Sequence, residues 1–324
     1  MRLLWQARSN PLAWWWLLLT LVSTANIAFW FLLYHQFHLQ PSPGMASISD
    51  SQVMLSLCAA YVFGCAFRSF LPRADVQRIC LFDTWLSSVL IGRSVATVAE
   101  ICFAAQWAIV LHQLAEIAGV DTTLYVAWAI VPLIFLAQCC SWYGVLTTNY
   151  LANAIENSIW AVAFLVVGIG LCWLLPEYEG LLRLALVVAL IGVAAYLAFL
   201  ITIDVPMYLT RWQEGLADGS SKALGALEGL RDASTRRVVT HDFAQWKDEI
   251  AWMSLYFSVA VWASLVLCLV YSLGDHLPRY RVEPAAGVLE KQHATIDALA
   301  PNPLSRLQRA SALPRLLTKK SPHA

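Results

Sequence analysis

Residues 181–203 read LLRLALVVALIGVAAYLAFLITI and contain a single charged side chain, Arg183. The hydrocarbon core of a membrane is about 30 Å thick, and a helix needs about 20 apolar residues to cross it. This stretch has that length and that composition. It therefore predicts a transmembrane helix.

Six other stretches meet the same criterion, so the sequence predicts an all-α integral membrane protein, a bundle of about seven transmembrane helices within residues 1–280. The first stretch follows Arg2 and Arg8, as in a signal peptide, but it is longer than the usual apolar core of about 7–15 residues. We therefore predict an uncleaved span. The second is the weakest, because Arg68 lies at its end, and a re-entrant segment is the alternative. The predicted spans run near 12–34, 52–69, 85–113, 122–146, 150–175, 181–203 and 250–273.

The composition supports a membrane protein with lipids as its surroundings. Of the 324 residues, 59% are hydrophobic and 13% are charged, whereas a soluble domain has about 25% charged residues. The 21 basic and 21 acidic residues balance, and a nucleic-acid-binding domain usually carries a basic stripe. We therefore expect membrane lipids as partners and no nucleic acid.

The cysteines and histidines do not predict a metal site. The eight cysteines lie mostly in apolar runs and form no C-x-x-C pair, although clustered ligands are needed for metal binding. His35 and His38 fall in a predicted loop. The spans contain no lysine, so a retinal Schiff base is excluded despite the number of helices. The sequence gives no indication of a cofactor.

Basic residues between the spans predict the orientation. Lys and Arg are enriched in cytoplasmic loops, and the predicted loops 35–51, 114–121 and 176–180 contain none. The segment between spans two and three and the loop 204–249 contain several. The N-terminus is therefore expected in the cytoplasm, in an inner or plasma membrane, with the C-terminus outside.

Two further segments are predicted outside the spans. The stretch 213–230 is polar with leucines at helical spacing, which indicates a short amphipathic helix on the cytoplasmic face. Residues 281–324 are rich in Pro, Ala, Ser and basic residues, which predicts a flexible basic tail. The basic residues of this tail oppose the predicted orientation.

Ionisable side chains inside a span are costly, so they are candidates for function. In the third span Arg93, Thr97 and Glu100 are spaced i, i+4, i+7 and share one helical face. We predict a catalytic role for Glu100 and a substrate-binding role for Arg93 and Thr97. An Arg–Glu tie between helices is the structural alternative.

The fifth span begins with a polar stripe. Asn149, Asn153, Glu156 and Asn157 follow i, i+4, i+7, i+8 on an otherwise apolar helix. We predict Glu156 as a catalytic group and the three amides as substrate-binding groups. Amides that join helices are the alternative.

Most of these polar groups lie on the cytoplasmic half of the predicted bundle. Asp204 ends span six and Arg211 follows it, so we add Asp204 as a catalytic candidate and Arg211 as a substrate-binding candidate. The asymmetry predicts a pocket open to the cytoplasm and lined by spans three, five, six and seven. A solvated loop surface is the alternative for the residues at the rim.

Paired carboxylates with arginines suit acid–base chemistry or the binding of a phosphate headgroup. No D-D-x-x-D, G-x-S-x-G or glycine-rich phosphate loop occurs in the sequence. The leading hypothesis is a membrane-embedded enzyme acting on a lipid or isoprenoid-like substrate, with an apolar or amphipathic small molecule as ligand. A small-molecule or ion transporter and a sensor or structural subunit of a membrane complex remain as alternatives, and the oligomeric state is not predicted.

Overall fold

The computed structural model describes residues 10–39, 48–217, 219 and 224–273. In this part of the chain seven helical segments are long and apolar enough to cross a membrane, which confirms the all-α class. The predicted tail, 281–324, lies outside the described residues. The segments are α2 (Pro11–Leu39), α3 (Ile48–Phe70), α4 (Val89–Ala118), α5 (Asp121–Thr147), α6 (Tyr150–Leu174), α7 (Gly180–Phe199) with its continuation, and α10 (Phe243–Leu255) with its continuation.

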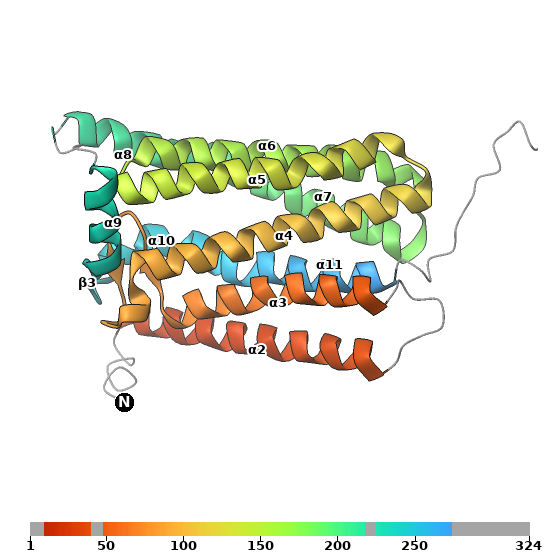
Figure 1. Ribbon diagram of the computed structural model, residues 1–324, viewed down its shortest axis with the longest axis horizontal. Coiled ribbons are helices and arrows are strands. Elements are labelled where there is room, and N and C mark those ends of the chain that lie inside the picture. The colour runs from red at the N-terminus through yellow and green to blue at the C-terminus, as the bar shows by residue number, and fades with distance from the viewer. Residues whose placement is uncertain (1–9, 40–47, 218, 220–223, 274–324) are drawn as a thin grey trace, which may run out of the picture. The chain divides into compact units, whose positions relative to one another are not determined.

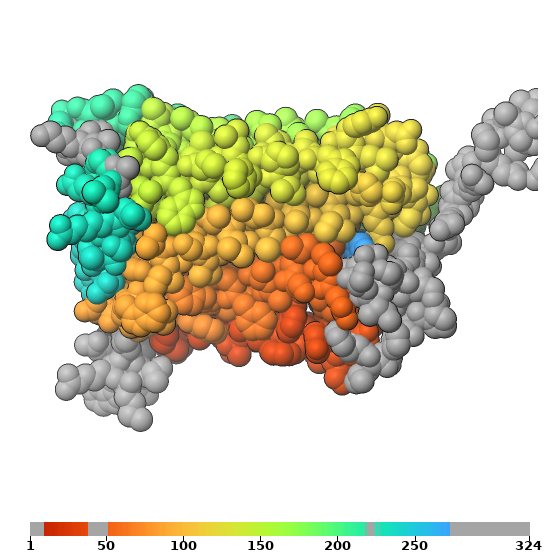
Figure 2. Space-filling view, viewed as in Figure 1, coloured from red at the N-terminus to blue at the C-terminus, as the bar shows by residue number. Residues whose placement is uncertain are grey.

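From α2 to α7, helices that follow one another along the chain pack side by side (Figure 1). The surface shows the same order, because α2, α3, α4 and α5 form successive bands in Figure 2. The α4–α5 turn is tight. Gly119, the C-cap of α4, has φ +72°, and glycine adopts this left-handed conformation at little cost because it has no Cβ atom. The last helix of the described residues, α11 (Val261–Leu273), packs against α2, α3 and α4.

One end of the bundle carries most of the structure outside the seven helical segments. Strands β1 (Arg73–Ala74), β2 (Ile79–Cys80) and β3 (Val238–Val239) form a small sheet in that order. Strand β1 is antiparallel to β2, and β2 is parallel to β3. Helix α9 (Ala226–Thr235) lies at the same end (Figure 1). We call the end of the bundle that carries the sheet and α9 the polar end, and the end that carries the α4–α5 turn the opposite end.

The outward faces of the helices are apolar. Leu32, Leu181 and Ile191 are exposed by 64%, 79% and 64%. Soluble proteins rarely expose contiguous apolar patches of more than a few hundred Å². Lipid tails would cover such side chains without cost.

Spans six and seven differ from their predicted form. Helix α7 continues through a π-helix, η3 (Leu200–Asp204), into α8 (Val205–Ala217). Helix α10 continues through a second π-helix, η4 (Tyr256–Ala260), into α11. The seventh span therefore begins at Phe243, seven residues earlier than predicted, because Asp242 caps the helix by accepting from the Ala244 amide at 3.0 Å.

The predicted amphipathic helix over 213–230 is divided between two helices. Its first residues complete α8, which ends at Ala217, and its last residues begin α9 at Ala226. Between them Gly219 has φ +63°, a left-handed conformation that helices do not contain. The leucine spacing alone did not indicate this break.

Candidate functional site

A buried polar cluster lies around Arg93 in the first turns of α4. The Arg93 Nη2 atom donates to Glu100 Oε2 at 2.9 Å and to Gln138 Oε1 of α5 at 2.6 Å. Gln138 Nε2 in turn donates to Glu100 Oε2 at 2.5 Å. The group that we call the Arg93 cluster comprises Arg93, Glu100, Gln138, Asn153, Glu156 and Tyr256.

Glu100 has the most complete set of partners in the cluster. Besides Arg93 and Gln138, the Tyr256 hydroxyl donates to its Oε1 at 2.9 Å. Tyr256 is the first residue of the π-helix η4, and π-helical turns are frequent at functional sites. The Glu100 carboxylate is therefore held by three donors from α4, α5 and the seventh span.

Glu156 of α6 has fewer and longer contacts. Asn153 Nδ2 donates to its Oε2 at 3.2 Å, and Arg93 Nη1 lies 3.9 Å from its Oε1. Asn153 Oδ1 has no hydrogen-bond partner among the described residues. It lies over Gly144, where a Cβ atom would approach within 2.9 Å. Two carboxylates thus share one guanidinium group. The Glu156 carboxylate accepts fewer hydrogen bonds than the Glu100 carboxylate and so keeps more capacity to accept others.

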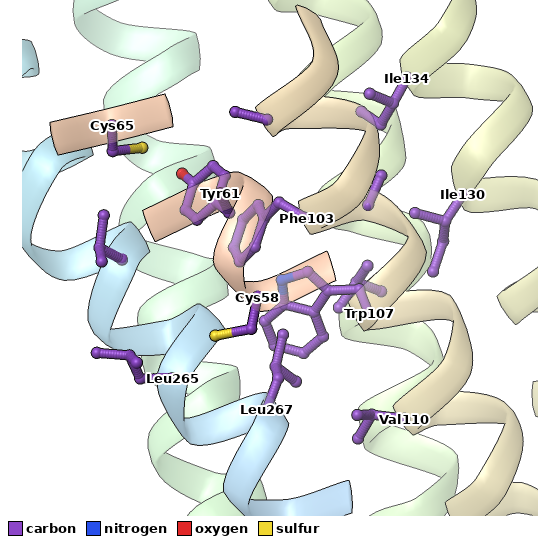
Figure 3. Close-up of a cluster of buried hydrophobic side chains, with 14 of the residues drawn as sticks. Cys58, Tyr61, Cys65, Phe103, Trp107, Val110, Ile130, Ile134, Leu265 and Leu267 are labelled. Atoms are coloured by element: carbon purple, nitrogen blue, oxygen red, sulfur yellow. The ribbon is translucent and has the colours of Figure 1, made fainter. Parts of the chain in front are cut away.

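An aromatic layer lies immediately beyond the cluster. Tyr61 of α3 stacks on Phe103 with ring centroids 4.4 Å apart, and Phe103 contacts Trp107 edge-on (Figure 3). The layer continues to Phe164 and Trp160 of α6. On α4 and α6 these rings follow the two glutamates in the direction of the opposite end. The carboxylates therefore lie on the polar-end side of the layer.

A second group of charges is centred on Arg211 of α8. Its Nη2 atom lies 3.2 Å from Asp248 Oδ2, and its Nη1 atom lies 3.5 Å from Glu249 Oε1. Glu249 is buried and also accepts from Gln77 Nε2 at 2.7 Å and from Trp252 Nε1 at 2.6 Å. This Arg211 cluster joins α8, α10 and the segment between α3 and α4.

A third group joins Arg68, in the last turn of α3, to Arg73 and Asp75 in the segment between α3 and α4. Asp75 Oδ1 accepts from Arg73 Nε at 2.9 Å and from Arg68 Nη2 at 3.4 Å. Burial alone would raise the pKa of Asp75, but the guanidinium groups of Arg68 and Arg73 hold it below its ordinary value. Burial lowers the pKa of Arg73, and the charge of Asp75 only partly opposes that effect.

The structure brings together four of the predicted site residues, namely Arg93, Glu100, Asn153 and Glu156. Thr97 lies beside them and accepts from Trp142 Nε1 at 3.0 Å.

The other predicted residues lie apart from this cluster. Asn149 is the N-cap of α6 and accepts from the Leu151 amide at 3.0 Å. Asn157 is half-buried and makes no hydrogen bond with a described residue. Asp204 ends η3 near Arg211 and Glu249, and it makes no hydrogen bond within the described part of the chain.

Sequence reasoning missed Gln138, Tyr256 and Glu249 as partners. Gln138 could have been found, because it is a lone amide in the apolar run IFLAQCC and such amides often join helices. A tyrosine such as Tyr256 gives no comparable signal.

Within the described residues no three His, Cys, Asp or Glu side chains are grouped so that they could hold a metal ion. Comparison of the chain with protein-family models, with curated proteins and with solved structures found no match in any of the three. A functional proposal therefore depends on the geometry of the clusters.

Proposed function

We propose that the chain is an integral membrane enzyme that acts on a lipid or isoprenoid-like amphipathic substrate at the Arg93 cluster, with the polar end in the cytoplasm. One observation carries the proposal. Glu100 and Glu156 share Arg93 but differ in their partners, and pairs of carboxylates in unequal surroundings are typical of acid–base sites.

The membrane part of the proposal rests on length and exposure. Seven helical segments have the length and hydropathy of transmembrane helices, and large apolar side chains cover their outward faces. The orientation rests on the predicted loops without Lys or Arg, 35–51, 114–121 and 176–180.

The proposed chemistry assigns different roles to the two glutamates. Glu100, engaged by three donors, fixes Arg93 and Gln138 in place. Glu156 retains free acceptor capacity and would take a proton from the substrate or give one to it. Glu156 lies six residues from the first residue of α6, which is about 9 Å of helical rise. A substrate head would reach it from the polar end, and the aromatic layer would receive an apolar tail.

A transporter is the second candidate, because buried polar groups continue along α4. Ser264 Oγ of α11 donates to Gln106 Oε1 at 2.6 Å, and Gln106 Nε2 donates to the Ser264 carbonyl at 3.3 Å. Cys58 of α3 lies beside them. We call this group the Gln106 cluster. It lies beside the aromatic layer and provides polar atoms further towards the opposite end.

The test compares membranes that contain the wild-type chain with membranes that contain Glu156→Gln. A lipid or isoprenoid species that changes with the wild-type chain should return to its level in cells lacking the chain. Asn153→Ala should reduce the change less, because it removes a neighbour and not the ionisable group. Glu116→Gln is the matched control, since the Glu116 side chain is 62% exposed near the opposite end.

The readouts separate the candidates. An altered uptake of a solute, with unchanged lipids, would support the transporter. Wild-type activity in well-folded Glu156→Gln protein would remove this residue from the site and with it the enzyme proposal. Proportional loss of yield and activity in both Glu156→Gln and Asn153→Ala would mean that the polar stripe only joins helices.

Orientation has its own test, which uses single cysteines in a chain without the eight native ones. A cysteine at Gly225 should react only with a reagent added from the cytoplasmic side, and one at Ala310 only from outside. Labelling of the cysteine at position 225 from outside would show that the orientation is the reverse of the proposed one. Labelling of the cysteine at position 310 from the cytoplasm alone would show a different number of spans.

A further inference from the structure

The last turn of α3 and the segment that follows it place two buried arginines on one carboxylate. The side chains of Arg68 and Arg73 are 6% and 2% exposed, and both pair with the same oxygen of Asp75. Two guanidinium groups share this one carboxylate, and the compensating carboxylate belongs to the adjacent Arg93 cluster, where Glu100 and Glu156 share Arg93. The other acceptor near Arg68 and Arg73 is the Arg73 carbonyl, 3.4 Å from Arg68 Nη2. Buried donors that lack an acceptor are costly, so the arrangement needs an explanation.

Several buried guanidinium nitrogens have no hydrogen-bond partner. They include Arg68 Nε and Arg73 Nη1. Nearly all buried donors in folded proteins are hydrogen-bonded, and an exception often marks a missing water or ion. Arg93 Nε, in the adjacent cluster, is also buried without a partner. The charge of Arg93 acts on Asp75 as well, so the two groups are close in space.

Arg78, in the same segment, shows what a purely structural arginine looks like here. It is as buried as the other two, and each of its three nitrogens donates. Nε reaches Asp232 at 2.7 Å, Nη1 the Asp75 carbonyl at 2.6 Å and Nη2 the Val145 carbonyl at 2.9 Å. The local fold can therefore satisfy a buried arginine completely. It does not do so for Arg68 and Arg73.

The space around Arg73 depends on a glycine in the first turn of α4. A Cβ atom at Gly92 would lie 2.8 Å from Arg73 Cδ and 2.8 Å from Arg73 Nη1. The guanidinium group therefore rests against the beginning of α4. The N-terminus of a helix carries partial positive charge, which favours an anion nearby.

We propose that Arg68 and Arg73 bind a phosphate group. The planar fork of arginine matches phosphate oxygens, and an anion would accept from the free N–H groups of Arg68 and Arg73. This inference rests on the proposed function and names its substrate class: an amphipathic molecule whose phosphate lies at Arg68 and Arg73 while its reacting part lies at Glu156.

The test measures binding without turnover, so it can fail or succeed independently of the proposed chemistry. The purified full chain is kept in dodecyl maltoside, a detergent without phosphate, and its melting temperature is followed as inorganic phosphate is added against chloride at equal ionic strength. A second arm adds phosphatidic acid to the same detergent. Stabilisation in the first arm indicates a soluble phosphate compound, and stabilisation in the second arm alone indicates a lipid headgroup.

Matched variants separate binding from folding. Arg73→Gln and Arg68→Gln should weaken the apparent affinity by about tenfold or more, since each removes charge-assisted hydrogen bonds. Asp75→Asn should tighten binding, because it removes the carboxylate that both arginines share. Arg236→Gln is the control, since the Arg236 side chain is 61% exposed at the same end.

The direction of the Asp75→Asn effect is decisive. If the group is only structural, all the variants should be less stable and should gain less melting temperature from phosphate. If it is a phosphate site, that gain should increase in Asp75→Asn and decrease in Arg73→Gln. If Arg73→Gln does not fold, Arg73→Lys keeps the charge and should still lose affinity, because an ammonium group cannot reproduce the fork. Absence of stabilisation in both arms, or an equal response in wild type and Arg73→Gln, would overturn the proposal.

Discussion

Helix α4 carries two buried polar groups that differ in kind. In the Gln106 cluster neutral side chains complete each other: Gln106 and Ser264 are fully buried, and the amide and the hydroxyl bond directly. In the Arg93 cluster three charges meet, and one of two carboxylates holds most of the donors. Paired neutral groups suffice to join helices. The unequal charges are unnecessary for packing, which is why the proposed site lies there.

The largest expected effect is that of Glu100→Leu. The substitution leaves Arg93 facing only the distant Glu156 carboxylate, at 3.9 Å. Removing one partner of a buried ion pair typically costs about 3–5 kcal/mol. We expect a strong loss of folded yield and of melting temperature in detergent, whereas Glu156→Gln should melt like the wild type. If Glu100→Leu melts normally, Glu100 does not hold the cluster together.

A smaller effect is expected in the Gln106 cluster. Hydrogen bonds between transmembrane helices contribute about 0.6 kcal/mol on average and at most about 1.7 kcal/mol. Gln106→Leu should therefore lower the melting temperature modestly, and so should Ser264→Ala. The double variant should lose less melting temperature than the two single variants together, because neither side chain is left without its partner. Strict additivity would show that the two side chains do not stabilise each other, and the contrast between the clusters would disappear.

The sequence predicted what depends on one helix and failed where several helices meet. Hydropathy located the seven apolar helices because each contains a long and nearly continuous apolar run. Periodicity placed Arg93 and Glu100 on one face, and they pair. The stripe on α6 was only half informative: Asn153 contacts Glu156, but Asn149 is used as a helix cap. A cap and a binding group have the same residue type at the same spacing.

The partners from other helices could not be predicted, because they depend on how helices pack. Gln138 and Tyr256 reach Glu100 from α5 and from η4, and no spacing within one helix indicates that meeting. The sheet at the polar end consists of strands of two residues, too short to show alternation. The sharing of one carboxylate, Asp75, by Arg68 and Arg73 likewise appears only once the contacts between segments are known.

The smallest expected effect extends the comparison to Asp75, a largely buried carboxylate outside the seven helical segments. Its pKa is below the ordinary value of 3.8, because the charges of Arg68 and Arg73 outweigh the opposing effect of burial. A depressed pKa stabilises the fold above the unfolded-state pKa, and this stabilisation is lost as the pH falls through the folded-state pKa. The melting temperatures of wild type and Asp75→Asn should therefore differ most at neutral pH and converge as the pH falls below about 4. Comparing the two proteins cancels the acid response of the other carboxylates, which both share. A difference that stays constant from pH 7 to about 3 would mean that ionisation of Asp75 does not stabilise the polar end, and that Arg68 and Arg73 are balanced by another group.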